Sequence, residues 1–195
     1  MKHAPVLLQE VIKYLDPQKR DFVIDGTVDG GGHAAAILEK IGPRGILLGL
    51  DWDKNMLAKC ESQITNRKNV ILICGNYADL PEILKEKKLP KADGLLLDLG
   101  FSSEQLEAGR GFSFQKDEPL IMTYGEGRKP VAQLLRELSE KELADIIFNF
   151  GGERMSRRIA KAIKEHGKRK PITGSGELAE IIKGAVPKNY ERGRI

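Results

Sequence analysis

Cysteine is scarce, because the 195 residues contain only Cys60 and Cys74. Two cysteines form neither a disulfide framework nor the four-ligand pattern of a structural zinc site, so the sequence predicts no metal site. Cys74 lies in an apolar segment and is expected to be a small core residue. Cysteines without a disulfide pattern are typical of a reducing compartment, and the sequence therefore predicts a cytoplasmic protein.

Long hydrophobic runs are also absent. No apolar stretch reaches the roughly 18 to 20 residues that cross a bilayer. Residues 1–9 contain too short an apolar stretch for a secretory signal and no small-residue cleavage site. We therefore expect no membrane partner. The composition, with 41% hydrophobic and 31% charged residues, is that of an ordinary globular protein with one core domain and a smaller appendage.

An excess of positive charge is absent from the first part of the chain and present in the second. Residues 1–127 contain 16 Lys+Arg and 19 Asp+Glu, whereas residues 128–195 contain 16 and 9. A basic segment suits a polyanion such as RNA, although a solvated helical surface has the same composition. Arg154, Arg157 and Arg158 have helical spacing and are expected to form one basic face. Contact with an RNA backbone and a solvated or Glu-paired surface are the alternatives for that face.

Short apolar runs alternate with helical patterns through the first half of the chain. The expected strands are 22–25, 45–51, 69–74 and 93–99, and the expected helices are 5–15, 33–41, 53–65 and 79–87. The apolar runs show little alternation, so each strand is expected to be buried on both faces, as in parallel sheets. This order predicts an α/β protein with a Rossmann-like, doubly wound sheet. Its ligand crevice is expected at the carboxyl ends of the first and fourth strands.

After residue 99 the strand signal stops. Residues 100–128 are rich in Gly, Ser and Phe and are expected to form a long functional loop. Helices are then expected over residues 130–137, 139–149, 153–166 and 176–184. We predict a cofactor-binding core over residues 1–110, a substrate-site loop over residues 111–129, and a basic, RNA-facing helical region over residues 130–195.

The most informative stretch is Asp25-Gly-Thr-Val-Asp-Gly-Gly-Gly-His33, which lies between an expected strand and an expected helix. Such a turn brings backbone N–H groups close to a nucleotide-like ligand, because a Cβ would block the approach. The dinucleotide spacing Gly-x-Gly-x-x-Gly fails at Val28. Asp25 and Asp29 would repel a pyrophosphate but tolerate a sulfonium cation. The turn therefore favours S-adenosylmethionine as the cofactor, with NAD as the alternative.

Other expected strand ends carry side chains suited to a nucleoside. Asp51 can accept hydrogen bonds from a ribose diol, and Tyr77 can stack on adenine or act as a packing residue. Asp98 and the hydroxyls of Ser102 and Ser103 can accept N–H bonds from an exocyclic amine and align it for catalysis. A strand end with a capped loop is the structural alternative for this last segment.

Three residues of the loop suit contact with RNA. Phe101 can stack on an extruded base, and Arg110, beside two glycines, can reach a phosphate. Phe112 is expected to be either part of an aromatic platform or an anchor that holds the loop to the core.

Taken together, these segments resemble a known family, the bacterial small-subunit ribosomal RNA cytosine-N4 methyltransferases (the MraW or RsmH family). The matching segments span nearly the whole chain in family order: His3-Ala-Pro-Val-Leu-Leu-Gln-Glu10, Asp25-Gly-Thr with Gly30-Gly-Gly-His33, Leu50-Asp-Trp-Asp53, Gly75-Asn-Tyr-Ala-Asp-Leu80, Asp93-Gly-Leu-Leu-Leu-Asp-Leu-Gly-Phe-Ser-Ser103, Gln105-Leu, Arg110-Gly-Phe-Ser-Phe114 and Gly152-Glu-Arg-Met-Ser-Arg-Arg-Ile-Ala160.

The resemblance implies a class I methyltransferase core with a helical domain inserted after the fourth strand. It implies methylation of the exocyclic N4 of a cytidine in 16S rRNA, so the expected partner is 16S rRNA or the small ribosomal subunit. It also implies cofactor contacts at Gly31, Gly32, His33, Asp51, Tyr77, Asp98 and Gln105. The turn itself adds Asp25 and Gly30 to these expected contacts.

The chain departs from the family pattern in several ways. Asp29 stands where the family usually has glycine, and Ile121 and Thr123 replace a carboxylate and an arginine. Family members also continue past the helical region with further strands, so we expect a form shortened at its C-terminal side. Its sheet edge would then be exposed. A fragment, a degenerate copy and a short form that covers this edge by forming a homodimer are the alternatives. A non-catalytic or degenerate protein of the same fold that binds S-adenosylmethionine or RNA is the alternative function.

Overall fold

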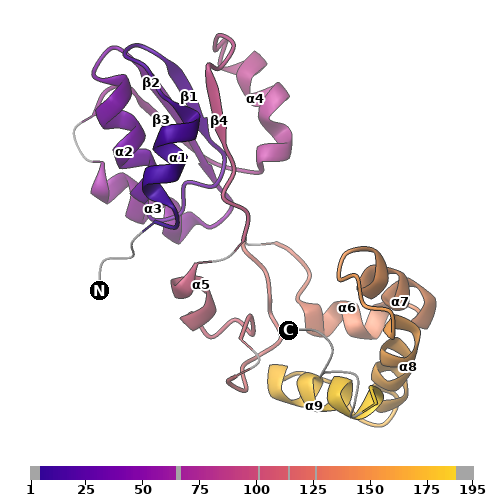
Figure 1. Cartoon of the computed structure of the whole chain (residues 1–195). Coiled ribbons are helices and arrows are strands. Elements are labelled where there is room, and N and C mark those ends of the chain that lie inside the picture. The colour runs from indigo at the N-terminus through magenta and orange to yellow at the C-terminus, as the bar shows by residue number, and fades with distance from the viewer. Residues whose placement is uncertain (1–4, 65–66, 101, 114, 126, 188–195) are drawn as a thin grey trace. The chain divides into compact units, whose positions relative to one another are not determined.

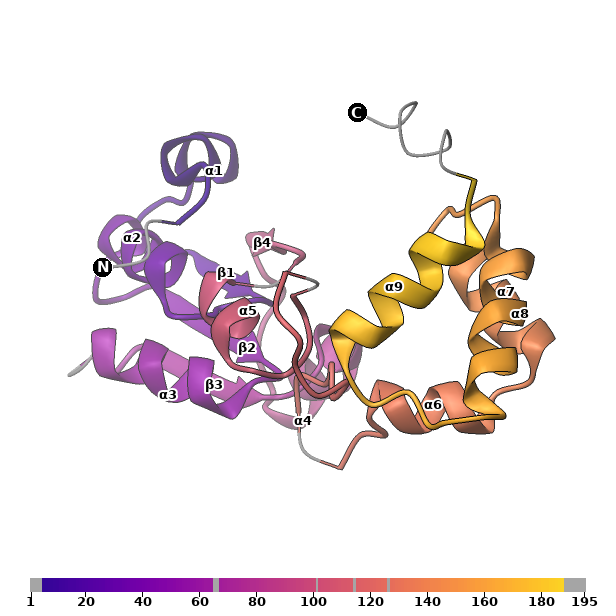
Figure 2. The same ribbon diagram turned by 90° about the horizontal axis from the view of Figure 1, so that it is seen from below.

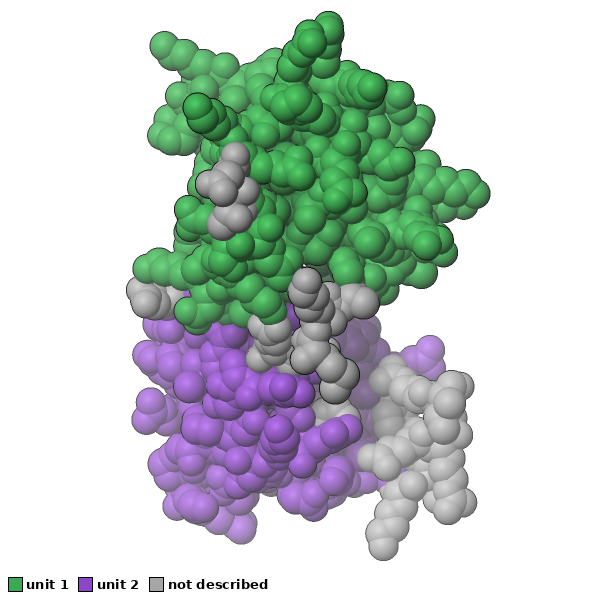
Figure 3. Space-filling model, turned by 90° about the vertical axis from the view of Figure 1, so that its left-hand side faces the viewer, with its two compact units in different colours: residues 1–100 green, residues 101–195 purple. Residues whose placement is uncertain are grey.

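The computed structural model describes residues 5–64, 67–100, 102–113, 115–125 and 127–187. The chain forms two compact units, residues 1–100 and residues 101–195, which Figure 3 shows in different colours. The predicted division into a cofactor-binding core, a substrate-site loop and an RNA-facing region is functional and stays a prediction.

Unit 1 is a parallel four-stranded sheet with helices (Figure 1). Its elements are α1 (Leu8–Leu15), β1 (Phe22–Asp25), α2 (Gly32–Ile41), β2 (Ile46–Asp51), α3 (Lys54–Gln63), β3 (Val70–Cys74), the 3₁₀ helix η1 (Tyr77–Asp79), α4 (Leu80–Glu86) and β4 (Gly94–Leu96). The strand order is β3-β2-β1-β4, with every neighbouring pair parallel. The predicted α/β, Rossmann-like fold is confirmed.

The order of the strands sets where a ligand crevice forms. The chain leaves β1 for β2 on one side and later returns to pair β4 on the other side of β1. The crossover helices therefore diverge at the carboxyl ends of β1 and β4, and this switch point is where open α/β sheets bind ligands.

The core of unit 1 lies on both faces of β1 and β2. On one face, Val23 and Leu47 pack with side chains of α1, α2 and α3. On the other face, Ile24 and Leu48 pack with side chains of α4. The helices that cover the two faces can be followed in Figures 1 and 2. Because successive side chains of a strand point to opposite faces, the three apolar residues of β1, Phe22, Val23 and Ile24, contribute to both layers.

The expectation that all four strands are buried on both faces is wrong for β3 and β4. Residues of β1 and β2 are almost all buried, whereas those of β3 and β4 are half-buried or exposed. The reason is position, because β3 and β4 each have one neighbour in the described sheet. Leu95 is 49% exposed and Leu99 is 65% exposed. The homodimer expected to cover this edge stays a prediction.

Cys74 is a second correction, because it is exposed rather than a core residue. It occupies the last position of β3, where the strand leaves its covering helices. Cys60 is the buried cysteine, on the face of α3 that packs against the glycine turn. Burial raises the pKa of the Cys60 thiol to about 12, so this thiol stays protonated at neutral pH.

Strand β4 is shorter than the expected 93–99. It pairs only with β1, through Val23–Gly94, Ile24–Leu95 and Asp25–Leu96. Since β1 ends at Asp25, the residues after Leu96 have no ladder partner. The next segment is held by a side chain instead, because the Asp98 N–H donates to the Thr27 hydroxyl oxygen at 2.7 Å.

Unit 2 is helical. It contains α5 (Ser103–Glu107), α6 (Val131–Glu137), α7 (Glu140–Asn149), α8 (Ser156–Gly167) and α9 (Ser175–Ala185). The four helices expected after residue 130 are confirmed to within three residues at each end, and the short α5 was not predicted. The core contains Leu120, Leu135, Leu143, Ile159 and Ile163. The Lys164 ammonium donates to the carbonyl oxygens of Leu135, Arg136 and Leu138 and so satisfies the end of α6.

The described helices include none that combines the length and the apolar character that a membrane span requires. Within the same residues, His, Cys, Asp and Glu side chains form no group of three or more that is suited to hold a metal ion.

A core substitution should distinguish the buried strands from the exposed edge. Leu48→Ala leaves a cavity in a fully buried position and is expected to lower the free energy of unfolding of unit 1 by about 2–5 kcal/mol. Leu95→Ala, at the half-exposed edge, should cost less than about 1 kcal/mol. Urea unfolding followed by the fluorescence of Trp52, the single tryptophan, measures both. Equal losses would contradict the assigned burial.

Candidate active site at the carboxyl edge of the sheet

The glycine turn is tied to the end of β2 by backbone and side-chain hydrogen bonds. The Val28 N–H donates to the Leu50 carbonyl at 2.9 Å, and the Gly31 N–H donates to the Val28 carbonyl at 2.8 Å. Asp29 has a φ of 43° and Gly31 a φ of 89°, so both adopt the left-handed conformation. Glycine adopts it without strain, whereas at Asp29 the backbone must be held there by its surroundings.

The glycines serve close packing within the protein more than the sequence suggested. A Cβ on Gly26 would lie 2.6 Å from Leu97, one on Gly31 would lie 3.0 Å from the Cys60 sulfur, and one on Gly32 would collide with the Pro5 ring. A Cβ on Gly30 would have more space than at the other three positions of the turn. Its nearest neighbour would be the side chain of Lys59, at 3.4 Å. Of the three successive glycines, Gly30 therefore has the most open side.

Asp51 joins the turn to the second strand. One carboxylate oxygen accepts the Asp29 N–H at 2.9 Å, and the other accepts the Asp53 N–H at 2.8 Å. The two bonds fix the orientation of the carboxylate, and each oxygen keeps further acceptor capacity for hydroxyl donors. Partial burial raises the pKa of Asp51, while the two N–H donors oppose that shift. The position suits a ribose diol, and that contact stays a prediction.

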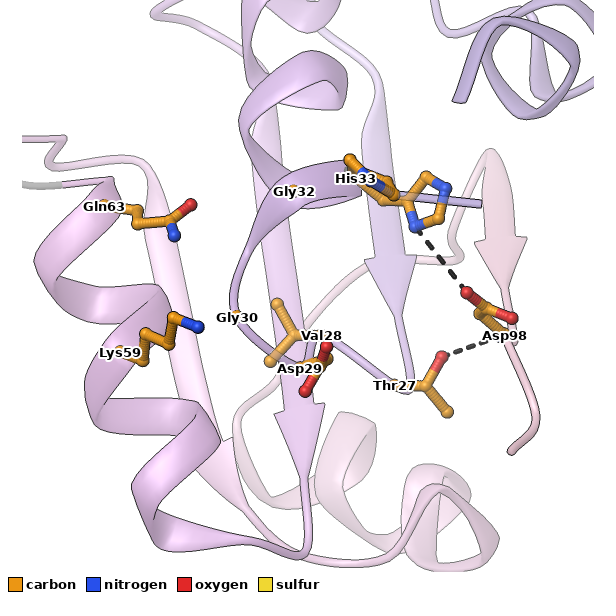
Figure 4. Close-up of a pocket in the computed structure, with 10 residues that line it drawn as sticks. Thr27, Val28, Asp29, Gly30, Gly32, His33, Lys59, Gln63 and Asp98 are labelled. Atoms are coloured by element: carbon orange, nitrogen blue, oxygen red, sulfur yellow. Dashed lines mark hydrogen bonds and ion pairs between the residues drawn. The ribbon is translucent and has the colours of Figure 1, made fainter. Parts of the chain in front are cut away.

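A pocket opens over the turn (Figure 4). It is lined by Pro5, Thr27, Val28, Asp29, Gly30, Gly32, His33, Lys59, Gln63 and Asp98. Four predicted site residues, Gly30, Gly32, His33 and Asp98, therefore lie together. Sequence reasoning missed the contributions of Lys59 and Gln63, which α3 supplies. Their spacing of four places them on one face of that helix, but only the packing of α3 shows that this face borders the turn.

His33 connects three segments at the edge of this pocket. Its Nε2 lies 3.1 Å from the Val6 carbonyl oxygen, and its Nδ1 lies 4.0 Å from an Asp98 carboxylate oxygen. The imidazole is 9% exposed, whereas the Asp98 side chain is 52% exposed. With its backbone held by Thr27, Asp98 presents an accessible carboxylate at the switch point.

Asp25 is a deeply buried carboxylate, with 1% exposed. It does not line the pocket, and neither do the predicted cofactor residues Gly31, Asp51, Tyr77 and Gln105. One carboxylate oxygen accepts the Thr27 N–H at 3.2 Å, and the other has no hydrogen-bond partner. Burial is the main cause that raises its pKa to about 7, followed by repulsion from Asp51, Asp98 and Asp29. Any influence of Asp25 on a ligand in the pocket is therefore electrostatic.

Tyr77 begins the 3₁₀ helix after β3 and is 40% exposed. Its Cβ lies 3.2 Å from the position that a Cβ on Gly26 would occupy, which places the Tyr77 backbone beside the turn. A partly exposed ring at this edge is available for stacking, and the adenine contact stays a prediction.

Several predicted residues belong to unit 2. Gln105 is buried, and its side-chain oxygen accepts the Ser102 N–H at 2.9 Å, while the Ser102 hydroxyl accepts the Gln105 N–H at 3.3 Å. This capping box starts α5. Ser102 therefore has the capping role given as the structural alternative for its segment, whereas the local role of Gln105 was not predicted. Phe101 and the Ser103 side chain lie outside the described residues.

The loop residues Arg110 and Phe112 lie together. The Arg110 guanidinium donates to the Thr123 carbonyl at 3.2 Å and lies 5.7 Å from the centre of the Phe112 ring. The Phe112 ring is also 5.1 Å from that of Tyr124. Both contacts join residues of the same loop, so the platform and the anchor stay alternative predictions for Phe112, as does its contact with a base.

The basic face expected on one helix is only partly helical. Helix α8 begins at Ser156, so Arg157 and Arg158 lie on it, whereas Arg154 precedes it. The reason is a turn in which the Met155 N–H donates to the Glu153 carboxylate at 2.7 Å. All three arginines are exposed.

Comparison with known proteins finds relatives over the whole chain. The MraW methylase family matches residues 1–195. The chain is 44% identical to the ribosomal RNA small subunit methyltransferase H of Syntrophus aciditrophicus over 99% of its own length and 62% of that protein. It is 43% identical to the protein of the same name from Thermosipho africanus, over 99% of its own length and 66% of that protein. The chain thus spans about two thirds of the length of these relatives.

The buried carboxyl group of Asp25 predicts a pH-dependent stability. Its folded pKa of about 7 exceeds the ordinary value of 3.8, so the folded state binds the proton more tightly than the unfolded state. The stabilisation is present below about pH 4 and is lost as the pH rises through 7. At about 1.4 kcal/mol per pKa unit, it amounts to a few kcal/mol at most.

Asp25→Asn removes this titration and keeps an oxygen for the Thr27 N–H. Between pH 5 and pH 8, the unfolding temperature of the wild-type protein should fall more steeply than that of the variant. Thermal unfolding followed by circular dichroism at each pH measures the difference. Parallel profiles for the two proteins would show that Asp25 is not protonated in the folded state.

Proposed function

Because this chain belongs to the MraW methylase family, we propose that it binds S-adenosylmethionine and contributes to the methylation of the exocyclic N4 of a cytidine in 16S rRNA. The observation that carries this proposal is that three features lie at one edge of the sheet. The glycine turn follows β1, Asp51 ends β2, and Asp98 lies just beyond β4. This is the switch point of a parallel sheet, where a nucleoside cofactor is expected.

The charge of the site supports a cationic cofactor. Burial is the main cause that raises the pKa of Asp25, and repulsion from Asp51, Asp98 and Asp29 adds to it, so four carboxylates act on one region. A pyrophosphate would add to this repulsion, whereas a sulfonium or ammonium cation relieves it. When bound, S-adenosylmethionine supplies a methyl group on a positively charged sulfur. The residues present fit that group, because the pocket over the turn is lined by the carboxylates of Asp29 and Asp98 together with Gly30.

The chain's own residues hold the cofactor in this proposal. The Asp51 carboxylate, oriented by the Asp29 and Asp53 N–H groups, accepts hydrogen bonds from the ribose hydroxyls. The Tyr77 ring stacks on adenine, and the backbone of Gly30, Gly31 and Gly32 lies against the amino-acid end. The cofactor contact proposed for Gln105 rests on the family alone, because its side-chain oxygen already accepts the Ser102 N–H.

Asp98 is the group proposed to act on the base. An exocyclic amine is a weak nucleophile, because its lone pair is delocalised into the ring. A carboxylate that accepts its N–H bond orients the lone pair and takes up the proton released on methylation. Asp98 is exposed enough to meet a substrate, and the Thr27 hydroxyl holds its backbone. The Ser102 and Ser103 hydroxyls are proposed as further acceptors.

Unit 2 supplies the groups proposed to bind the RNA. Residues 128–195 contain 16 Lys+Arg and 9 Asp+Glu, and exposed arginines at 154, 157 and 158 offer charge to phosphates. Arg110 and Phe112 lie in the loop that precedes these helices, and Phe101 is proposed to stack on the extruded base.

The ribose assignment is tested by Asp51→Asn. The amide keeps the shape of the side chain but loses its charge, so the affinity for S-adenosylhomocysteine should fall about tenfold, as expected for charge-assisted hydrogen bonds. Isothermal titration calorimetry measures the affinity. Glu39→Gln removes a charge from an exposed position of α2 and serves as the control. An affinity unchanged by Asp51→Asn would remove the ribose from this site.

The reaction is tested by transfer of a labelled methyl group to unmodified small ribosomal subunits and to their RNA. Asp98→Asn should lower the transfer rate by a factor on the order of 10² to 10⁴, the usual contribution of a general base. The labelled product should be N4-methylcytidine after digestion. If the wild-type chain binds S-adenosylmethionine but transfers no methyl group, the alternative holds, namely a non-catalytic binding protein of the same fold.

A further inference from the structure

Lys59 projects from α3 toward the glycine turn (Figure 4). Its ammonium nitrogen lies 3.6 Å, and its Cε 3.4 Å, from the position that a Cβ on Gly30 would occupy. The charge is therefore held over the backbone at the most open part of the turn. Lys59 is half-buried, and it lines the same pocket as Gln63, one helical turn further along α3. A half-buried ammonium beside open backbone is suited to an anionic group of a ligand.

Asp29 places the opposite charge on the turn itself. Its Oδ1 is buried and has no hydrogen-bond partner, although its backbone N–H is bonded to Asp51. Burying a carboxylate oxygen without a partner is costly, and Asp29 also holds a φ of 43°, which is unfavourable for a residue with a Cβ. A cationic ligand group that donates to Oδ1 would offset the first of these costs.

Part of the backbone of the turn is already engaged within the protein. The N–H groups of Val28, Asp29 and Gly31 donate to Leu50, Asp51 and Val28, respectively. A glycine turn that cradles an anion does so through such N–H groups. Fewer of them therefore remain for an anion at this turn, and Lys59 is positioned to add a charged donor from another element.

We propose that Lys59 and Asp29 form a clamp for the amino-acid end of the cofactor, with Lys59 binding the α-carboxylate and Asp29 accepting hydrogen bonds from the α-ammonium group. This inference rests on the proposed function, because it takes the ligand to be a nucleoside that carries an α-amino acid. Its consequence is selectivity, since nucleosides without that zwitterionic end gain nothing from the pair.

The clamp is tested by comparing two ligands in the full chain. S-adenosylhomocysteine carries the amino-acid end, whereas 5′-methylthioadenosine has the same nucleoside and thioether without it. Calorimetric titration of the wild-type chain should show tighter binding of S-adenosylhomocysteine. Lys59→Met should lower the affinity for S-adenosylhomocysteine about tenfold, the effect expected for one charge-assisted hydrogen bond. The affinity for 5′-methylthioadenosine should stay unchanged. Lys59→Arg should retain most of the affinity.

Two further variants complete the test. In Asp29→Asn, the asparagine adopts the left-handed backbone and the charge is removed. The affinity for S-adenosylhomocysteine should therefore fall, while that for 5′-methylthioadenosine should not. Lys54→Met removes an exposed charge at the start of the same helix, outside the pocket, and should change neither affinity.

The outcomes separate the clamp from the proposed function. Equal affinities of the wild-type chain for the two ligands would overturn the clamp alone. An unchanged affinity for S-adenosylhomocysteine in Lys59→Met, or an equal loss for both ligands, would do the same. If the wild-type chain binds neither ligand, the proposed cofactor and the clamp both fall.

Discussion

The candidate site depends on the bonds between the Asp51 carboxylate and two backbone N–H groups. Asp51 is the last residue of β2, Asp29 lies in the turn after β1, and Asp53 is the residue that precedes α3. One side chain therefore holds together three elements whose relative placement forms the pocket. The bond to Asp29 also helps to hold a residue with a Cβ in the left-handed region. Partial burial strengthens such bonds, because water competes with them less.

The segment that brings Asp98 to the pocket is held by a different hydrogen bond. Strand β4 has no ladder partner after Leu96, yet the following segment must present Asp98 to the crevice. The bond from the Asp98 N–H to the Thr27 hydroxyl extends the connection between β1 and β4 beyond the last backbone pair. A sheet with a topological switch point opens a crevice, and these side-chain bonds determine which groups border it.

The glycines show that a motif and its physical cause can differ. A glycine-rich turn indicates close backbone approach, and the structure shows close approach at Gly26, Gly31 and Gly32. The approaching atoms, however, belong to the protein, namely Leu97, Cys60 and Pro5. Sequence could not reveal this, because the three partners come from segments far from the turn along the chain. The part of the turn with the most open side is Gly30, beside Lys59.

The sequence by itself determined most of the secondary structure, the parallel sheet and the edge of that sheet at which Asp51 and Asp98 lie. Those properties follow from local periodicity and from the topology that short apolar strands and intervening helices allow. Only the tertiary structure decided which side chains meet across elements. It exposed Cys74 at an edge strand, buried Asp25 away from the pocket, and brought Lys59 from α3 over the turn. These outcomes depend on how helices pack onto the sheet, and the spacing of residues along one segment carries no information about the neighbour it will contact.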